Sequence, residues 1–409
     1  MKDTLLSLLD AIHGANPDTT FEVVFWDGVQ TKFGQGEPLF RAYVNSAEAL
    51  RRLLAAGSLG FADGYIDGDI TVEGDLYALL RLGVDPRFQA RKLSLRTRLQ
   101  ALRHAFLTRN TLRGARRNIR HHYDLGNDFY KLWLDESMTY SCAYFETPED
   151  ALEEAQAQKH DHICRKLRLQ PGETLIDIGC GWGGMLIHAA QHYGVRGVGC
   201  TLSDLQVIHA QEHIRELGLE DRIEVRNQDY RKLKGTFDKF VSIGMFEHVG
   251  RRYIPGFMRK VRGLLKPGGT GLLHTIGIEH VKWSGGWVNK YIFPGGYLPQ
   301  LGEISNSLGD VELTVHDVEN LRFHYALTLE EWARRYEEHA GEVEAMFDGA
   351  FVRKWRLFLN GAAAGFRYGR LRLYQVLFAN GLEADIPLTR RYMYPAKTRA
   401  ETAETPSMP

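Results

Sequence analysis

An aspartate and three glycines near the middle of the chain have the clearest chemical potential. Asp177 lies in a run of apolar residues, 175–178, that is typical of a short buried strand. Gly179, Gly181 and Gly183 follow this strand. Glycines at this spacing let the backbone turn tightly and approach a ligand closely before a helix begins. The stretch therefore predicts a loop that binds a nucleotide-type ligand.

The charge of this loop favours one class of ligand. The pyrophosphate fingerprint Gly-x-Gly-x-x-Gly fits the sequence only loosely, and the loop lacks the Lys-Ser/Thr pair of a phosphate-binding loop. The strand instead carries an aspartate just before the glycines, which suits a cationic ligand without phosphate. S-adenosylmethionine, with its sulfonium and ammonium groups, is such a ligand. A dinucleotide and a purely structural turn remain alternatives for the loop by itself.

The charge of the whole chain is balanced, but one segment is strongly basic. Lys and Arg together number 51, as do Asp and Glu, so the overall balance indicates no polyanionic partner. Between Pro86 and Tyr123 there is no acidic residue. The basic residues of this segment are Arg87, Arg91, Lys92, Arg96, Arg98, Arg103, Arg109, Arg113, Arg116, Arg117 and Arg120.

Apolar residues recur at helical spacing within this segment. Leu95, Leu99 and Phe106 fall on one face of a helix that carries arginines elsewhere on its surface. We expect residues 86–120 to form a basic amphipathic linker that binds the anionic headgroups of a phospholipid membrane surface. A solvated helix packed on the main domain is the alternative. Nucleic acid is not predicted as a partner, because the helix has a single aromatic side chain for base stacking.

Cysteine usage and hydropathy indicate a reducing compartment. Cys142, Cys164, Cys180 and Cys200 show no spacing that predicts a disulfide framework or a zinc site, so no metal is expected. No apolar run reaches the roughly 18 residues of a membrane span. Acidic residues interrupt the opening of the chain too early for a secretory signal. We expect a cytoplasmic protein that associates peripherally with the inner face of the membrane.

Residues 1–85 predict a small α+β domain. Strands are expected at 21–26 and 30–33, with a turn between them. Helices are expected at 47–56 and 76–82. Residues 57–60 predict a glycine cap on the first helix, and Gly64, Gly68 and Gly74 predict short turns before the second. Nothing in this domain indicates catalysis.

From residue 121 onward, strands and helices alternate. Strands are predicted at 174–178, 195–200, 222–226, 237–243 and 270–276, with helices at 185–193, 203–217 and 253–265 among them. This alternation predicts an α/β domain with a doubly wound, mostly parallel sheet. Helices near 329–345 and 351–365 and a strand at 371–378 complete a domain of residues 121–395. Residues 396–409 form a polar tail.

Six short motifs carry a resemblance to a known family. They are HYDLGN at 122–127, YSCAY at 140–144, LIDIGCGWGG at 175–184, GMFEHVG at 244–250, LLHTIG at 272–277 and NKYIFP at 289–294. In this order they resemble the cyclopropane fatty acid synthase family of S-adenosylmethionine-dependent methyltransferases. The resemblance implies a Rossmann-like class I methyltransferase fold. The N-terminal domain resembles that of bacterial members that act on phospholipid, which implies lipid docking or dimerisation.

The resemblance implies a set of cofactor contacts. The residues that match the family's contacts to S-adenosylmethionine are Tyr140, Ser141, Gly179, Gly181, Thr201, Gln206 and Asp229. One position departs from most methyltransferases, in which an acid after the second strand binds the ribose hydroxyls. Here that position is occupied by Cys200 and Thr201.

The resemblance also implies the reaction. A methylene group passes from S-adenosylmethionine across a cis double bond of a phospholipid acyl chain, through a carbocation, to give a cyclopropane. Bound bicarbonate is the base, held by Cys142, Glu247, His274 and Tyr325 with help from the backbone at Ile276. Because two adjacent anions would repel, we expect a raised pKa for Glu247.

Aromatic side chains near the second motif are candidates for the substrate site. Tyr123, Tyr144 and Phe145 are expected to stabilise the carbocation with their ring faces, and core packing is the alternative for each. Cys142 is not expected to act as a covalent nucleophile, because no His-Asp pair can be assigned to it.

Other functions remain open on the same fold. One alternative is methylation of an acyl chain without ring closure, and another is N-methylation of a small amine. A non-enzymatic alternative is a lipid-binding protein that has lost activity. The resemblance further implies a homodimer.

Overall fold

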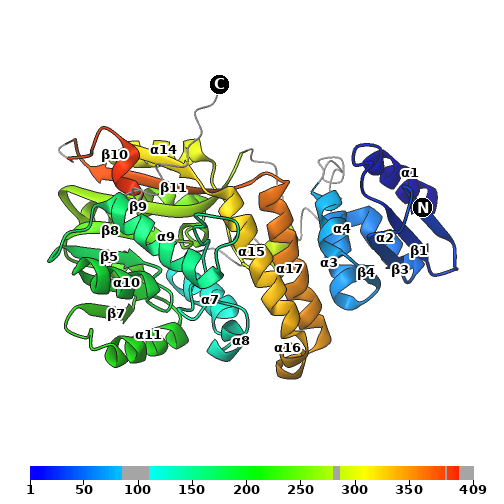
Figure 1. Ribbon diagram of the computed structural model, residues 1–409, viewed down its shortest axis with the longest axis horizontal. Coiled ribbons are helices and arrows are strands. Elements are labelled where there is room, and N and C mark those ends of the chain that lie inside the picture. Colours follow the sequence, from blue (N-terminus) through cyan, green and yellow to red (C-terminus); the bar gives the residue numbers. More distant parts are fainter. Residues whose placement is uncertain (85–109, 280–285, 383–384, 396–409) are drawn as a thin grey trace, which may run out of the picture.

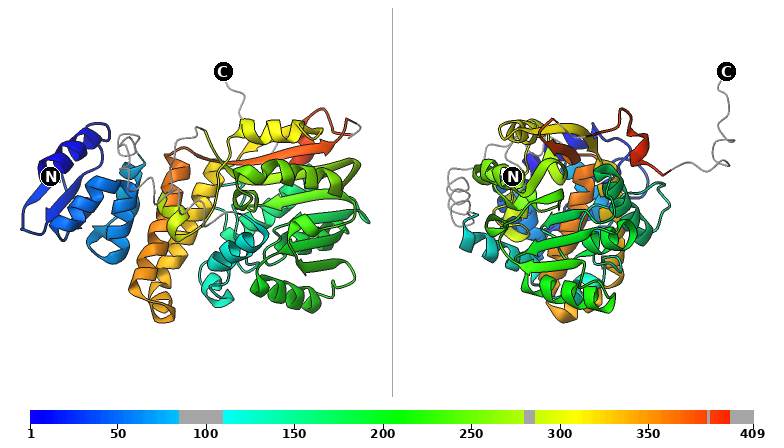
Figure 2. Two further views of the ribbon diagram at one scale, coloured as in Figure 1. Left: turned by 180° about the vertical axis from the view of Figure 1, so that it is seen from behind. Right: turned by 90° about the vertical axis from the view of Figure 1, so that its left-hand side faces the viewer.

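The computed structural model describes residues 1–84, 110–279, 286–382 and 385–395. The predicted amphipathic helix around 95–106 and the predicted tail 396–409 lie outside these ranges. A large sheet with its helices forms one end of the molecule, and a smaller N-terminal unit forms the other (Figure 1). Helices α15 (Arg322–Glu338), α16 (Ala340–Met346) and α17 (Gly349–Arg367) stand between them in both side-on views (Figures 1 and 2).

The large sheet has seven strands in the order β10-β11-β9-β8-β5-β6-β7. Their bounds are β5 (Thr174–Ile178), β6 (Arg196–Thr201), β7 (Ile223–Asn227), β8 (Phe237–Ile243), β9 (Leu265–Ile278), β10 (Leu313–Asn320) and β11 (Leu371–Asn380). The first five in chain order are parallel, whereas β11 runs antiparallel to both β9 and β10. The chain moves outward from β5 to β7 and then returns to β8. The direction of winding therefore reverses at β5, where open α/β sheets bind ligands beyond the carboxyl ends of their strands.

Helices cover both faces of this sheet. Helices α9 (Leu152–Leu167), α10 (Gly184–Tyr193) and α11 (Asp204–Glu216) share one apolar core with it. Helices α12 (Ile254–Leu264) and α14 (Leu301–Gly309) share a second core on the other face. Because both faces are covered, the central strand β5 is apolar almost throughout and nearly all buried. The sheet is doubly wound, as predicted.

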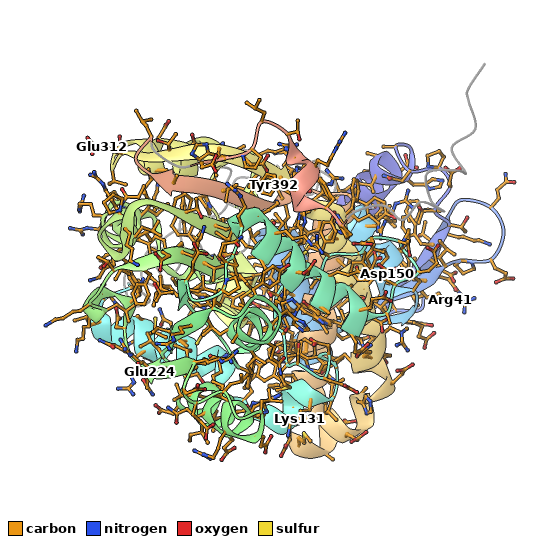
Figure 3. The ribbon with its side chains drawn as sticks, turned by 60° about the vertical axis from the view of Figure 1, so that its left-hand side comes forward. Arg41, Lys131, Asp150, Glu224, Glu312 and Tyr392 are labelled. Atoms are coloured by element: carbon orange, nitrogen blue, oxygen red, sulfur yellow. The ribbon has the colours of Figure 1, made fainter. Side chains whose placement is uncertain are left out.

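The two edge strands carry charged side chains. Glu224 on β7 pairs with Arg226 at 2.6 Å, and Glu312, next to β10, pairs with Arg262 at 2.6 Å. Figure 3 shows both glutamates at the periphery of the molecule. Charge at a sheet edge opposes pairing with another chain.

The N-terminal unit contains a four-stranded sheet and four helices. The sheet order is β2-β1-β3-β4, with bounds β1 (Phe21–Phe25), β2 (Gln30–Phe33), β3 (Phe40–Val44) and β4 (Ile70–Gly74). The helices are α1 (Lys2–His13), α2 (Ala47–Ala56), α3 (Ser58–Asp67) and α4 (Leu76–Gly83). The first two strands and helices α2 and α4 match the sequence prediction, whereas α1, β3 and β4 were not predicted.

The turn predicted at Gly64 is wrong, because residues 58–67 form a helix, whereas the cap predicted at 57–60 and the turn predicted at Gly68 are confirmed. Gly57 ends α2 and α3 begins at the next residue. Gly60 lies where α3 crosses α2, and a Cβ there would stand 2.2 Å from the carbonyl oxygen of Arg52. Gly64 would similarly place a Cβ 2.9 Å from Ile70. These glycines allow close packing of the helix, and only Gly68, with φ of 84°, ends it.

Polar contacts join the N-terminal unit to helices of the large domain, residues 110–395 as described. Asp63 accepts hydrogen bonds from Lys290 Nζ at 2.9 Å and from Tyr291 Oη at 2.7 Å. Both donors belong to α13 (Gly286–Tyr291). Tyr77 donates to Glu330 of α15 at 2.7 Å, and a small apolar cluster forms between α3 and α17. The N-terminal unit therefore packs directly on α13, α15 and α17 of the large domain.

The close crossing of α2 and α3 makes a testable demand on Gly60. We expect Gly60→Ala to lower the free energy of unfolding by about 1–3 kcal/mol, because backbone atoms must shift to admit the methyl group. Gly83→Ala is the matched control, since a Cβ at Gly83 meets nothing within 4 Å. Urea denaturation of both variants measures the difference. Equal stability of the two variants would contradict the proposed close packing.

Candidate active site

A cavity opens beyond the carboxyl ends of the central strands. We call it the cofactor cavity. It contains every residue that the sequence predicted to contact the cofactor: Tyr140, Ser141, Gly179, Gly181, Thr201, Gln206 and Asp229. These residues are separated by up to 89 positions in sequence, from Tyr140 to Asp229. The fold therefore gathers the predicted cofactor set around one space.

The glycine loop forms one wall of the cavity. Its backbone adopts a conformation that favours glycine. Gly179 has φ of 87° and Gly181 has φ of 56°, both in the left-handed region. The Gly179 amide donates to the carbonyl oxygen of Cys200 at 2.9 Å, which joins the loop to β6. A Cβ at Gly179 would lie 2.5 Å from Cβ of Met245, whereas one at Gly181 would meet nothing within 4 Å.

The wall after β6 is a hydrogen-bonded unit. Thr201 donates through Oγ1 to Oε1 of Gln206 at 2.7 Å, and both side chains are buried. Ser203 is the N-cap of α11, because its hydroxyl accepts a hydrogen bond from the Gln206 amide at 3.3 Å. The helix cap therefore comes from Ser203, and Thr201 faces the cavity.

Asp229 is held in a fixed orientation at the opposite wall. Arg231 donates to both of its carboxylate oxygens, from Nε at 2.8 Å and from Nη2 at 2.6 Å. Arg231 also donates to the carbonyl oxygen of Asn110 at 3.0 Å. A carboxylate held in this bidentate way presents a fixed acceptor at the cavity wall.

Besides Asp229, the buried residues Lys159 and Asp177 line the cavity, and Lys159 was missed from sequence. Lys159 on α9 is fully buried, and its Nζ donates to Oγ of Ser141 at 2.9 Å. Burial lowers the pKa of Lys159 to about 8 and raises the pKa of Asp177 to about 7. Among the described residues, Oδ1 of Asp177 has no hydrogen-bond partner. No local pattern in the sequence marks Lys159, because its role arises only when α9 packs beside the cavity.

The residues predicted for catalysis lie on segments that border the cavity. We call this predicted set the Glu247 cluster; its members are Cys142, Glu247, His274, Ile276 and Tyr325. Each comes from a segment next to the cavity wall: Cys142 follows Ser141, and Glu247 lies between the lining residues Met245 and His248. His274 is the β9 partner of the lining residue Ile243. Cys142 shares one core with Ile276 and Tyr325.

Glu247 is tied to β9 by a short hydrogen bond. Its Oε1 accepts from the amide of Ile276 at 2.6 Å, so in this structure Ile276 acts through Glu247. Burial raises the pKa of Glu247 to about 7, whereas the sequence prediction of a raised pKa rested on repulsion by a bound anion. In the described part of the chain, Oε2 of Glu247 and Nε2 of His274 are buried without partners. Each of these two polar atoms is therefore available to form a hydrogen bond with a small polar ligand.

Cys142 and Tyr325 complete the cluster on its apolar side. Cys142 is fully buried, and burial raises the pKa of its thiol. Its Sγ donates to the Ala143 carbonyl at 3.1 Å, so nothing activates it as a nucleophile. Tyr325 on α15 packs its ring 4.6 Å from that of Phe366.

The three residues predicted for substrate contact are placed differently. The side chain of Tyr123, at the end of α7 (Leu112–Tyr123), lies outside the described part of the structure. Tyr144 stacks between the rings of His162, at 4.3 Å, and His324, at 4.7 Å. Phe145 is buried in the core. Tyr144 and Phe145 do not line the cofactor cavity, so the geometry favours the packing alternative for both.

Comparison with known proteins decides the family. A family model described as mycolic acid cyclopropane synthetase matches residues 110–376. The chain belongs to the mycolic acid cyclopropane synthetase family. A second model, described as a domain of unknown function, matches residues 9–87. This member of the family is an S-adenosylmethionine-dependent methyltransferase, and its Rossmann-like class I fold agrees with the sequence prediction.

Relatives of this methyltransferase cover nearly the whole chain. It is 36% identical over 392 residues to a "probable fatty acid methyltransferase" of Pseudomonas putida, which covers 90% of this chain and 95% of the relative. It is 36% identical over 358 residues to the cyclopropane-fatty-acyl-phospholipid synthase of Escherichia coli K12; the match covers 85% of this chain and 90% of the relative. The crystal structure of mycolic acid cyclopropane synthase CmaA1 complexed with SAH and CTAB is 34% identical and has a TM-score of 0.62. This match covers 64% of this chain and 98% of the chain in that structure.

The glycine loop yields a prediction for cofactor binding. Gly179→Ala and Gly181→Ala both introduce a side chain at positive φ, but only the first also overlaps Met245. We expect Gly179→Ala to weaken S-adenosylmethionine binding by about tenfold or more relative to Gly181→Ala. Isothermal titration calorimetry of the two variants tests this. Equal affinities of the two variants would contradict the role of Gly179 in the wall that binds the cofactor.

The raised pKa of Glu247 predicts a pH-dependent stability. Its carboxyl ionises near 4.5 in the unfolded chain but only near about 7 in the folded protein, so the folded state binds more protons between these values. The free energy of unfolding therefore falls as pH rises through this window. Glu247→Gln removes this contribution, whereas the titration of Asp177 cancels in the comparison. We expect urea denaturation to show that the free energy of unfolding of Glu247→Gln increases relative to that of the wild-type protein as pH rises. A difference between the two proteins that stays constant with pH would contradict the raised pKa.

Proposed function

We propose that this methyltransferase transfers a methylene group from S-adenosylmethionine across a cis double bond of a phospholipid acyl chain. The products are a cyclopropane acyl chain and S-adenosylhomocysteine. The observation that carries the proposal is the Glu247 cluster, in which Oε2 of Glu247 and Nε2 of His274 lie buried without described partners. The carbocation left by methyl transfer must lose a proton, and loss from the transferred methyl closes the ring; this cluster suits a small oxyanion that would act as the base. The name of the Escherichia coli relative supports the same substrate class.

The cofactor cavity has the charge pattern that S-adenosylmethionine requires. We assign cofactor contacts to Tyr140, Ser141, Gly179, Gly181, Thr201, Gln206 and Asp229, all of which line it. Asp177 and Lys159 place opposite charges in the same cavity, and Oδ1 of Asp177 is unpartnered in the described structure. The amino-acid end of S-adenosylmethionine is a zwitterion, so its ammonium and carboxylate suit such a pair.

The proposed reaction balances as one methylene gained and one proton released. The alkene electron pair forms a bond to the methyl carbon, while the electron pair of the breaking carbon–sulfur bond stays on sulfur. A carbocation remains on the neighbouring carbon. Loss of one proton from the delivered methyl then frees the electron pair that closes the ring. Because an alkene is a weak nucleophile, the step requires close alignment in a dry pocket.

We assign bicarbonate to the Glu247 cluster as the base for this proton. When bound, bicarbonate would supply an oxyanion that accepts the proton from the methyl group. Burial raises the pKa of Glu247 to about 7, so the protonated form is well populated near neutral pH, and a neighbouring anion would favour that form further. Oε1 of Glu247 already accepts from the Ile276 amide, so Oε2 is the atom that carries the proton and donates. Cys142, His274 and Tyr325 complete the proposed site.

We also propose that the enzyme docks on an anionic phospholipid surface next to the cofactor cavity. Ala115 and Ile119 of α7 line the cavity, while Arg116 and Arg117 on the same helix are exposed. The helix thus carries exposed basic side chains next to residues of the cavity wall, of which Arg116 also pairs with Asp204 at 3.3 Å, and attraction to anionic lipid would hold the membrane surface near the cavity. No helix among the described residues is long and apolar enough to cross a bilayer. We also propose that the enzyme forms the homodimer that the resemblance implies.

A second candidate is methyl transfer to an acyl chain without ring closure. It is favoured by the name of the Pseudomonas putida relative, a probable fatty acid methyltransferase. The two reactions share the methyl-transfer step and differ in what happens to the carbocation. The product therefore distinguishes them.

Mass spectrometry of lipids tests the proposal. The purified enzyme is incubated with S-adenosylmethionine, bicarbonate and vesicles of cis-monounsaturated phospholipid that contain an anionic lipid. We expect the acyl chain to gain one methylene and to lose its olefin signal. Glu247→Gln, which lies outside the cofactor cavity, should bind S-adenosylmethionine normally and form little ring product. A gain with the olefin retained would support the second candidate, and no gain would contradict both.

A further inference from the structure

A row of polar side chains crosses three strands behind His274. In the register of the sheet, His274 on β9 is the direct partner of Gln375 on β11, and Gln375 is the direct partner of Glu319 on β10. Side chains directly opposite each other on neighbouring strands project from the same face. The antiparallel pairing therefore aligns an imidazole, an amide and a carboxylate across the sheet.

Helix α9 adds two basic side chains to this row. Lys166 is buried, and its Nζ donates to Oε1 of Gln375 at 2.9 Å and to Oε2 of Glu319 at 2.5 Å. His162, one turn earlier on α9, contacts the same Glu319 oxygen through Nε2 at 2.8 Å. Burial opposes the ionisation of Glu319, but the contacts with His162 and Lys166 outweigh it and lower its pKa to about 2. The row therefore ends in an ionised carboxylate paired with a buried ammonium.

Lys166 decides which way the Gln375 amide faces. An ammonium group can only donate, so the amide oxygen must point toward Lys166. The amide nitrogen, Nε2, then faces Nδ1 of His274 at 3.2 Å. Because an NH₂ group can only donate, Nδ1 of His274 must accept. The other ring nitrogen, Nε2, must then carry the proton of the neutral ring.

The protonated nitrogen is the one without a partner in the described structure. Nε2 of His274 is buried and makes no hydrogen bond to the described residues. Burial, with the nearby charges of Lys159 and Lys166, holds the pKa of His274 well below its usual range, which favours the neutral ring. A buried N–H without an acceptor is costly, so the site indicates a ligand that accepts.

We propose that Lys166 and Gln375 are positioning residues that hold His274 as the tautomer protonated on Nε2, so that the ring donates a hydrogen bond to the anion of the Glu247 cluster. This inference rests on the proposed function, because the acceptor is the proposed bicarbonate. Neither Lys166 nor Gln375 lines the cofactor cavity. Both residues therefore act through His274.

Gln375→Glu is the most informative variant. Its carboxylate has nearly the same shape as the amide and accepts from Lys166, but it also demands a proton on Nδ1 of His274. We expect the proton to move from Nε2 to Nδ1, so that Nε2 no longer donates. Gln375→Met removes the hydrogen bond without adding charge and releases the constraint on the tautomer. Gln170→Glu, at an exposed position, is the control for the added charge.

Nuclear magnetic resonance of the histidine ring nitrogens tests the positioning directly. The full-length protein is labelled with ¹⁵N-histidine, and the His274 signals are assigned by their loss in His274→Asn. We expect Nε2 to be protonated and Nδ1 unprotonated in the wild-type enzyme, and a protonated Nδ1 in Gln375→Glu. A protonated Nδ1 in the wild-type enzyme, or an unchanged ring in Gln375→Glu, would overturn the proposal.

Kinetics then test the consequence for catalysis. We expect Gln375→Glu to lower kcat by about ten- to a hundredfold, with unchanged affinity for S-adenosylmethionine and unchanged activity in Gln170→Glu. An unchanged kcat with a switched tautomer would overturn the role of the Nε2 donor. If the wild-type enzyme forms no ring product at all, the proposed function fails, and the resonance measurement alone decides whether Lys166 and Gln375 set the tautomer.

Discussion

The hydrogen bond from the Ile276 amide to Glu247 is the interaction on which the site depends most. At 2.6 Å it fastens the loop after β8 to strand β9. The same loop supplies Met245 to the cavity wall, where it fills the space above Gly179. A single backbone donor therefore fixes the position of the buried carboxyl and, through Met245, one wall of the cofactor cavity. The proposed chemistry needs both, because the base must stand beside the methyl group that it deprotonates.

A short segment after α13 connects the N-terminal unit to this site, in addition to the contact of Tyr77 with α15. Asp63 binds Lys290 and Tyr291 of α13. A few residues later, Pro294 lines the cofactor cavity, and the Tyr297 amide donates to the carbonyl oxygen of Glu247 at 2.8 Å. The residues between α13 and Tyr297 thus link the N-terminal unit, the cavity and the Glu247 loop. This arrangement places the small unit within reach of the chemistry although it contributes no residue to the cavity wall as described.

The parts of the site that were predictable from sequence are those with a local signal. The glycine loop follows from spacing and from an apolar strand, and both are properties of neighbouring residues. Lys159 and Gln375 carry no such signal, because their roles arise only when α9 and β11 pack beside segments far away in sequence. Tyr144 lies within a motif, but only the structure shows that its ring stacks between two histidines and does not line the cofactor cavity. The helix at 58–67 was missed because its glycines serve close packing, which a sequence pattern cannot distinguish from turns.

The central claim is that the delivered methyl group loses a proton inside the enzyme. The most direct measurement uses S-adenosylmethionine with a fully deuterated methyl group and follows the lipid product by mass spectrometry. Ring closure predicts a product that keeps two of the three deuterium atoms and has no olefin. A product that keeps all three would contradict the claim, because the methyl group would then have been transferred without deprotonation.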